Sequence, residues 1–180
     1  MEKDCRFLKK SYRASTEWRS SATSPIRWPR ELEWTALDQA ARELGLSLVP
    51  ADIKSADELE TAFAGMKKSK AEALFVYRTA LTFVAGKQIA DLAIAAHLAS
   101  CHSFREAVMA GGLVSLGPDR VAMAGPAAAQ IDKIIRGTSP GEIPVEQPTR
   151  YELCINLKTA RLLNLTVPPA LLAQADEVIE

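Results

Sequence analysis

Three stretches of this sequence bring together residue types that are used in enzyme active sites. Residues 101–103 read Cys-His-Ser, Ser115 is followed two residues later by a glycine, and residues 86–87 read Gly-Lys. A histidine beside a thiol or hydroxyl suggests a base and its nucleophile. A serine flanked by glycines suggests the strained turn of a hydrolase, and Gly-Lys suggests a phosphate-binding loop.

None of the three stretches meets the requirement of its chemistry. Neighbouring side chains on an extended segment point to opposite faces, so His102 faces neither of the residues beside it. A nucleophile elbow needs a glycine where Leu113 stands, and a phosphate-binding loop needs one where Leu81 stands. We therefore predict no catalytic residue. A small α/β hydrolase that uses Ser115 or His102 remains the weaker, enzymatic alternative.

The cysteines do not support metal binding. Cys5, Cys101 and Cys154 are widely spaced and include no Cys-x-x-Cys pair, which argues against a zinc site and against a disulfide framework. No glycine-rich dinucleotide fingerprint follows a predicted strand. We predict no metal and no organic cofactor, and we interpret Cys101 and Cys154 as buried free thiols.

The distribution of charge excludes some partners and divides the chain. The 22 basic and 22 acidic residues cancel, so we expect no nucleic-acid partner. Residues 1–30 hold eight basic and three acidic residues, and we predict a poorly ordered basic segment there, with a folded domain over 31–180. The first 30 residues also lack the apolar stretch of an export signal, so the chain as written is expected in the cytoplasm.

Helical and strand periodicities alternate from residue 31 onward. This alternation predicts an α/β fold with a doubly wound, parallel sheet that has helices on both faces. The proline-containing stretch 138–149 has no period, and we interpret it as a crossing between lobes. Helices are predicted at 31–44, 55–66, 81–97, 104–110 and 157–163, and a further helix is predicted to end at 136. Strands are predicted at 46–49, 72–77, 99–102, 113–116 and 151–155. The tail is predicted to be a short helix and an exposed end.

Two predicted strands end directly before residues that suit ligand binding. In doubly wound sheets, ligands bind beyond the carboxyl ends of the strands. The guanidinium fork of Arg105 could pair with a carboxylate of a solute, and an ion pair with Glu106 or another neighbour is the alternative. The predicted ligand-binding residues are Arg78, Thr79, Ser103, Phe104 and Arg105.

The end of the chain carries the most specific motifs. Residues 145–149 read VEQPT, residues 155–160 read INLKTA and residues 171–179 read LLAQADEVI. Together with 37–48, 57–76 and 104–118, these motifs closely resemble the later portion of the ABC transporter substrate-binding protein family, which includes tryptophan-binding relatives. The resemblance covers roughly residues 31–180. The loops 78–80 and 98–103 depart from the family pattern.

The resemblance implies a lobe of the type I periplasmic binding fold with C-terminal crossover segments. It implies no enzyme, but a protein that binds a small amino-acid-like or organic solute in a cleft between two lobes and delivers it to an ABC permease. Proteins of this family are periplasmic. Because a single lobe leaves the interlobe surface uncovered, we expect a homodimer through that surface. The alternative outside transport is a remnant or an interaction module with the same fold.

Overall fold

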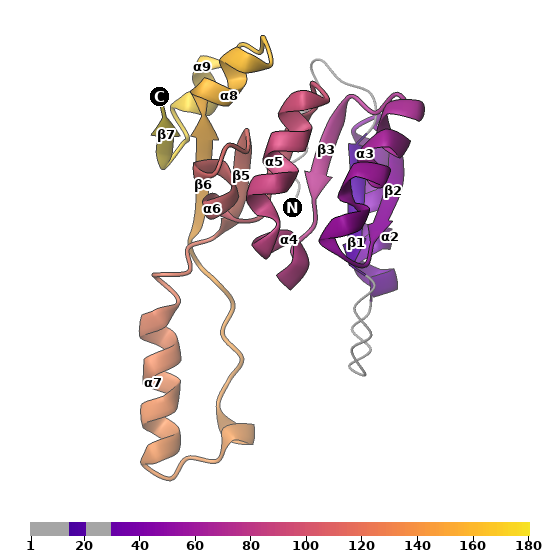
Figure 1. Ribbon diagram of the computed structural model, residues 1–180. Coiled ribbons are helices and arrows are strands. Elements are labelled where there is room, and N and C mark those ends of the chain that lie inside the picture. The colour runs from indigo at the N-terminus through magenta and orange to yellow at the C-terminus, as the bar shows by residue number, and fades with distance from the viewer. Residues whose placement is uncertain (1–14, 21–29) are drawn as a thin grey trace.

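The computed structural model describes residues 15–20 and 30–180 (Figure 1). The strands are β1 (Ser15–Ser20), β2 (Leu48–Ile53), β3 (Ala73–Val76), β4 (Ala99–His102), β5 (Val114–Pro118), β6 (Tyr151–Asn156) and β7 (Glu177–Ile179). The α-helices are α2 (Arg30–Glu43), α3 (Leu59–Lys68), α4 (Ala80–Val84), α5 (Gly86–Ala95), α6 (Arg105–Met109), α7 (Ala124–Ile135), α8 (Leu157–Leu162) and α9 (Pro169–Leu172). Two 3₁₀ turns, η2 (Ala56–Glu58) and η3 (Pro140–Glu142), complete the described elements.

The strands form one seven-stranded sheet in the order β2-β1-β3-β4-β5-β6-β7. Strands β1 to β5 run parallel to one another, which confirms the predicted α/β fold. The pairing of β5 with β6 is antiparallel, in contrast to our expectation of a wholly parallel sheet. The long excursion between these two strands returns the chain to the edge that it left, and β6 therefore runs in the opposite direction.

Helices cover both faces of the sheet because buried side chains alternate along its strands. In β3, Leu74 and Val76 pack with residues of α3 and α5 in one core cluster. Ala73, on the other face, belongs to a second cluster that includes Ala41 of α2 and Ala160 of α8. Apolar residues on both faces are typical of a strand covered on two sides. Helices packed on both faces of the sheet are the doubly wound arrangement that the sequence predicts.

Local chemistry explains where several elements begin and end. Pro50 lies within β2, which is tolerated because β2 is the edge strand of the sheet. The single helix predicted at 81–97 is divided at Ala85 into α4 and α5, and Ala85 leaves the helical region at ψ 7°. Asn156 caps α8, as its type suggests, by accepting a hydrogen bond from the amide of Thr159 at 3.0 Å.

Both ends of the chain add strands to the sheet that their composition did not predict. Within segment 1–30, which we expected to be poorly ordered, the structure describes β1 between β2 and β3; the rest of that segment lies outside the described residues. At the other end, β7 pairs with β6 where an exposed tail was expected. Within residues 15–20 and 30–180, no helix has the length and apolar character that crossing a bilayer requires.

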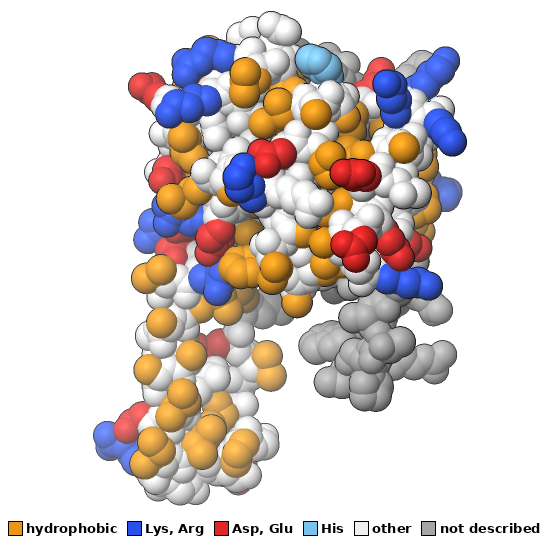
Figure 2. Space-filling model, viewed as in Figure 1, with side chains coloured by type: hydrophobic (Ala, Val, Ile, Leu, Met, Phe, Trp, Pro, Cys, Tyr) orange, Lys and Arg blue, Asp and Glu red, His pale blue; other side chains and the backbone are white. Residues whose placement is uncertain are grey.

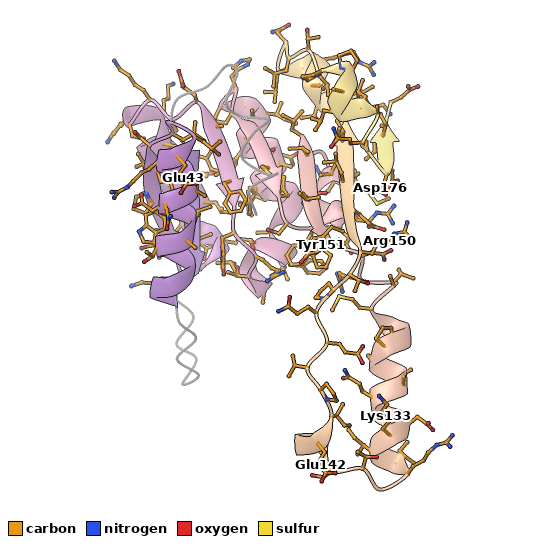
Figure 3. All side chains as sticks on the ribbon, turned by 180° about the vertical axis from the view of Figure 1, so that it is seen from behind. Glu43, Lys133, Glu142, Arg150, Tyr151 and Asp176 are labelled. Carbon is orange, nitrogen blue, oxygen red and sulfur yellow. The ribbon has the colours of Figure 1, made fainter. Side chains whose placement is uncertain are left out.

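Residues 121–149 extend from the body as an arm that consists of α7, η3 and an extended return (Figures 1 and 3). Pro126 is the third residue of α7, in the first turn where proline is tolerated. No residue of α7 is buried. Ile131, Ile134 and Ile135 are 57%, 43% and 78% exposed, which leaves apolar side chains uncovered along the arm (Figure 2).

Candidate functional site

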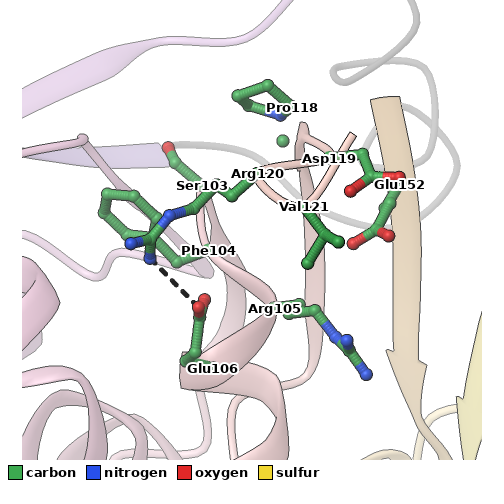
Figure 4. A pocket seen from close by; sticks show the side chains of 10 residues that line it. Ser103, Phe104, Arg105, Glu106, Pro118, Asp119, Arg120, Val121 and Glu152 are labelled. Atoms are coloured by element: carbon green, nitrogen blue, oxygen red, sulfur yellow. Dashed lines mark hydrogen bonds and ion pairs between the residues drawn. The ribbon is translucent and has the colours of Figure 1, made fainter. Parts of the chain in front are cut away.

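Two adjoining hollows lie at the edge of the sheet where the parallel strands β3, β4 and β5 end. The outer hollow has a volume of about 430 Å³ and opens widely to solvent. The inner hollow, of about 80 Å³, lies toward β6 (Figure 4). Phe104 and Arg120 line both. The outer hollow is lined by Arg78, Thr79, Ala80, Phe83, Phe104 and Arg120, and the inner one by Ser103, Phe104, Arg105, Glu106, Gly117, Pro118, Asp119, Arg120, Val121 and Glu152.

Two phenyl rings and a guanidinium form the centre of this edge. The Phe83 and Phe104 rings meet edge to face, with their centroids 5.0 Å apart and an interplanar angle of 77°. The Cζ atom of Arg120 lies 5.3 Å from the centroid of the Phe83 ring, within the range of a cation–π contact. Arg120 Nη1 also pairs with Glu106 Oε1 at 3.1 Å. The aromatic pair and this ion pair therefore hold Arg120 in place.

The loop after β3 is fixed by two threonines. Thr79 caps α4: its Oγ1 accepts the amide of Thr82 at 3.0 Å, and the Thr79 amide donates to Thr82 Oγ1 at 3.0 Å. Thr82 Oγ1 in turn donates to the carbonyl oxygen of Tyr77 at 2.7 Å. Arg78 is exposed and forms no ion pair with any residue in the described part of the chain. The loop thus presents a guanidinium on a rigid backbone.

Arg105 is occupied by a partner from a distant part of the sequence. Its Nη2 forms an ion pair with Glu177 Oε2 at the start of β7. The hydrogen bond to Glu177 and the charge of that carboxylate raise the pKa of Arg105 above its ordinary value. The structure therefore shows the alternative that we left open, a structural ion pair, although the partner is Glu177 and Glu106 pairs with Arg120 instead.

Asp119 and Arg150 join the two ends of the arm to the body of the protein. The amide of Asp119 donates to the carbonyl oxygen of Arg150 at 3.0 Å. The Asp119 carboxylate, which is 6% exposed, accepts the amide of Ala122 at 2.9 Å and lies 3.4 Å from Arg150 Nε. Neither residue was predicted from the sequence. Asp119 closely follows the predicted strand 113–116. The expectation that ligands bind beyond the carboxyl ends of strands, which pointed to Arg78 and Ser103, therefore applies to Asp119 as well.

The residues with apparent enzymatic character are enclosed in the core. His102 is 2% exposed, and its Nε2 lies 3.1 Å from the hydroxyl of Ser100. Burial lowers the pKa of His102 to about 4, so the imidazole is neutral at pH 7. Ser115 is 1% exposed, and its hydroxyl has no hydrogen-bond partner in the described structure. A solute cannot reach either group, so neither supports the hydrolase alternative.

Cys101 and Cys154 are both buried, as predicted. Burial raises the pKa of Cys154 to about 11, which keeps this thiol protonated at pH 7. Cys5 lies outside the described residues. Among the residues that the structure describes, no cluster of three or more His, Cys, Asp or Glu side chains could hold a metal ion.

The structure brings the five predicted ligand-binding residues to one edge of the sheet. Arg78 and Thr79 line the outer hollow, Ser103 and Arg105 line the inner one, and Phe104 lies between them. The chain order of the strands, 2-1-3-4-5, reverses direction between β1 and β3, and ligands of doubly wound folds bind at such a switch point. Whether these residues contact a solute remains a prediction.

An α/β lobe with exposed aromatic and charged residues at this edge is typical of a domain that binds small solutes. The sequence comparison agrees: residues 31–179 match the family described as ABC transporter substrate binding protein. The chain belongs to this family, whose members are binding proteins and not enzymes. No curated protein sequence matches the chain.

Solved structures of the same kind share the fold. A conserved domain protein from Vibrio cholerae aligns with a TM-score of 0.87 at 20% identity, over 98% of this chain and 59% of that one. The ABC domain in complex with L-Trp from Streptococcus pneumonia aligns with a TM-score of 0.85 at 20% identity, over 99% and 60%. A ligand-free, open substrate binding protein with adhesive properties from Clostridium difficile gives 0.70 at 17% identity, over 99% and 59%. The present chain thus spans about three fifths of each relative's length.

Proposed function

We propose that this chain is a solute-binding component of an ABC-type importer, or a portion of one. Its solute is a small amino-acid-like or other organic molecule, held in the cleft of a type I periplasmic binding fold. The observation that carries the proposal is the position of the five predicted residues, which line adjoining hollows at the carboxyl edge of the sheet. Membership of the substrate-binding family and the L-Trp bound to the Streptococcus relative support it.

The proposed site needs a second protein surface to enclose the solute. Enclosed solute sites in proteins usually have volumes of about 300–1,000 Å³. The inner hollow is far smaller, at about 80 Å³, and the outer hollow is wide open. A second lobe that closes over this edge would complete the enclosure, as hinge closure does in proteins of this type. The complete protein would act in the periplasm and would deliver its solute to a membrane permease.

The same uncovered surface favours self-association. Large apolar side chains are exposed on the arm at Ile131, Ile134 and Ile135 and at the edge of the sheet at Phe83. Exposed apolar patches of this kind mark interaction surfaces. We expect a homodimer through the uncovered interlobe edge, with the arm adding to the contact, and sedimentation of the Ile134→Lys variant should show more monomer than the wild-type chain. An unchanged monomer fraction would contradict the use of this surface.

A thermal-shift screen of the chain against amino acids, aromatic acids and short organic acids tests the solute-binding function. A solute present at a hundred times its dissociation constant stabilises a protein by about 2.7 kcal/mol, which raises the melting temperature by several degrees. The Phe104→Ala variant should lose that shift, whereas Arg42→Gln, which alters an exposed pair with Asp38 on α2, should keep it. The absence of a shift from every solute class would contradict the proposal.

A further inference from the structure

We propose that the outer hollow takes an aryl carboxylate without an ammonium group, with the carboxylate on Arg78 and the ring against Phe83 and Phe104. This inference rests on the proposed function, because it specifies the chemical class of the solute. The inference goes beyond the proposed function because it specifies an organic anion and not an amino acid. The reasons are the charge of the hollow, its apolar floor and the distance to the unpaired carboxylate of the inner hollow.

The lining of the outer hollow carries uncompensated positive charge. Among the described residues that line it, Arg78 and Arg120 are charged and none is a carboxylate. Arg120 has its counter-charge in Glu106, at 3.1 Å. Arg78 has no ion pair within the described part of the chain, so its planar guanidinium can hold a carboxylate through two parallel hydrogen bonds.

The floor of the outer hollow is aromatic. Phe83 is 42% exposed, unusually open for a large apolar side chain, and its ring meets Phe104 edge to face at 5.0 Å. A flat ring that covers Phe83 removes apolar surface from water, and aromatic pairs gain additional stability from their edge-to-face geometry. The guanidinium of Arg120, held 5.3 Å from the Phe83 centroid, borders the same floor.

An amino acid would lack a partner for its ammonium group here. The lining hydroxyl, that of Thr79, is already engaged, because its Oγ1 accepts the amide of Thr82 and shares a hydrogen bond with Thr82 Oγ1 at 3.1 Å. Among the described residues that line the two hollows, the carboxylate without an ion-pair partner is that of Glu152, which lines only the inner hollow.

The sheet separates Glu152 from Arg78. Glu152 lies on β6 and Arg78 follows β3, three strands away in the order β3-β4-β5-β6. Neighbouring strands are about 4.8 Å apart, so the two elements lie roughly 14 Å apart. The ammonium and carboxylate of an α-amino acid are attached to the same carbon and cannot bridge that distance. An anion without an ammonium group leaves no unpaired charge.

Fluorine NMR of small probes with the 180-residue chain at pH 7 tests the inference. The probes are 4-fluorobenzoate, its neutral amide 4-fluorobenzamide, and 4-fluorophenylalanine, each titrated while the ¹⁹F transverse relaxation is recorded. We expect 4-fluorobenzoate to bind at least ten-fold more tightly than either of the other probes. Arg78→Gln should weaken its binding at least ten-fold and leave the affinity for 4-fluorobenzamide unchanged.

Two variants control for charge and folding. Arg42→Gln removes an exposed arginine on α2 and should not alter the affinity for 4-fluorobenzoate. Arg78→Lys keeps the charge without the planar fork and should retain part of it. Equal or tighter binding of 4-fluorophenylalanine, or 4-fluorobenzoate binding that Arg78→Gln leaves intact, would overturn the inference while solute binding itself stands. If no probe binds and no solute stabilises the chain, both proposals fall.

Discussion

Acidification should destabilise this protein through His102. The imidazole is 2% exposed, and burial lowers its pKa from 6.5 to about 4. In the unfolded chain, His102 binds a proton as the pH falls below its ordinary pKa, but in the folded protein it remains neutral until about pH 4. The unfolded state therefore holds more protons between these values, and the free energy of unfolding falls as the pH falls. At about 1.4 kcal/mol per pKa unit, the loss amounts to roughly 3 kcal/mol.

Urea unfolding followed by circular dichroism from pH 7 to pH 4 measures this loss. The His102→Gln variant keeps a polar side chain near Ser100 but cannot titrate, so its free energy of unfolding should fall by roughly 3 kcal/mol less over the same range. The imidazole ring packs closely against Gly112, where an added Cβ atom would lie 2.7 Å from the ring. Equal pH dependence in the two proteins, or an imidazole that titrates near pH 6.5 by NMR, would show that His102 does not destabilise the folded protein at low pH.

Three further predictions concern residues that support the strands and the arm around the site. Gly117→Ala would place a Cβ atom 2.2 Å from the carbonyl oxygen of Ser103 and should cost about 1–3 kcal/mol of stability in urea; Gly125→Ala, which meets nothing within 4 Å, should cost nothing. Asp119→Ala removes the acceptor of an amide at the base of the arm and should speed proteolysis within residues 121–149; unchanged cleavage would count against the anchoring role. Asn156→Ala deletes the cap of α8 and should lower the free energy of unfolding by about 1 kcal/mol; a cost below about 0.5 kcal/mol would contradict it.

The elements with strong hydrophobic periodicity could be predicted from the sequence. Phe63 and Met66 on α3 and the apolar run of β3 all lie in the core, because side-chain periodicity directly reflects which face is buried. The strand β1 could not be predicted, since its sequence STEWRS contains one large apolar residue. Its place between β2 and β3 depends on pairing with strands that lie 28 or more residues away along the chain.

The site was predicted in outline because parallel strands end at a common edge. The hydrogen bonds and ion pairs within it could not be predicted. Arg105 pairs with Glu177, 72 residues later, and no local pattern indicates such a partner. Thr79 forms a capping box with Thr82, where sequence rules look for Glu or Gln three residues after the cap. The direction of β6 could not be predicted either, because the length of the arm does not determine which way the chain returns.

Amide shifts in ¹H–¹⁵N spectra, recorded on addition of the best stabilising solute, would locate the binding site on the protein. If the carboxyl edge of the sheet binds solutes, the largest shifts fall on residues that line the two hollows, such as Thr79, Phe104 and Arg120. They saturate with a single dissociation constant. Shifts that gather instead around α8 and α9, at the opposite edge of the sheet, would contradict solute binding at the carboxyl edge.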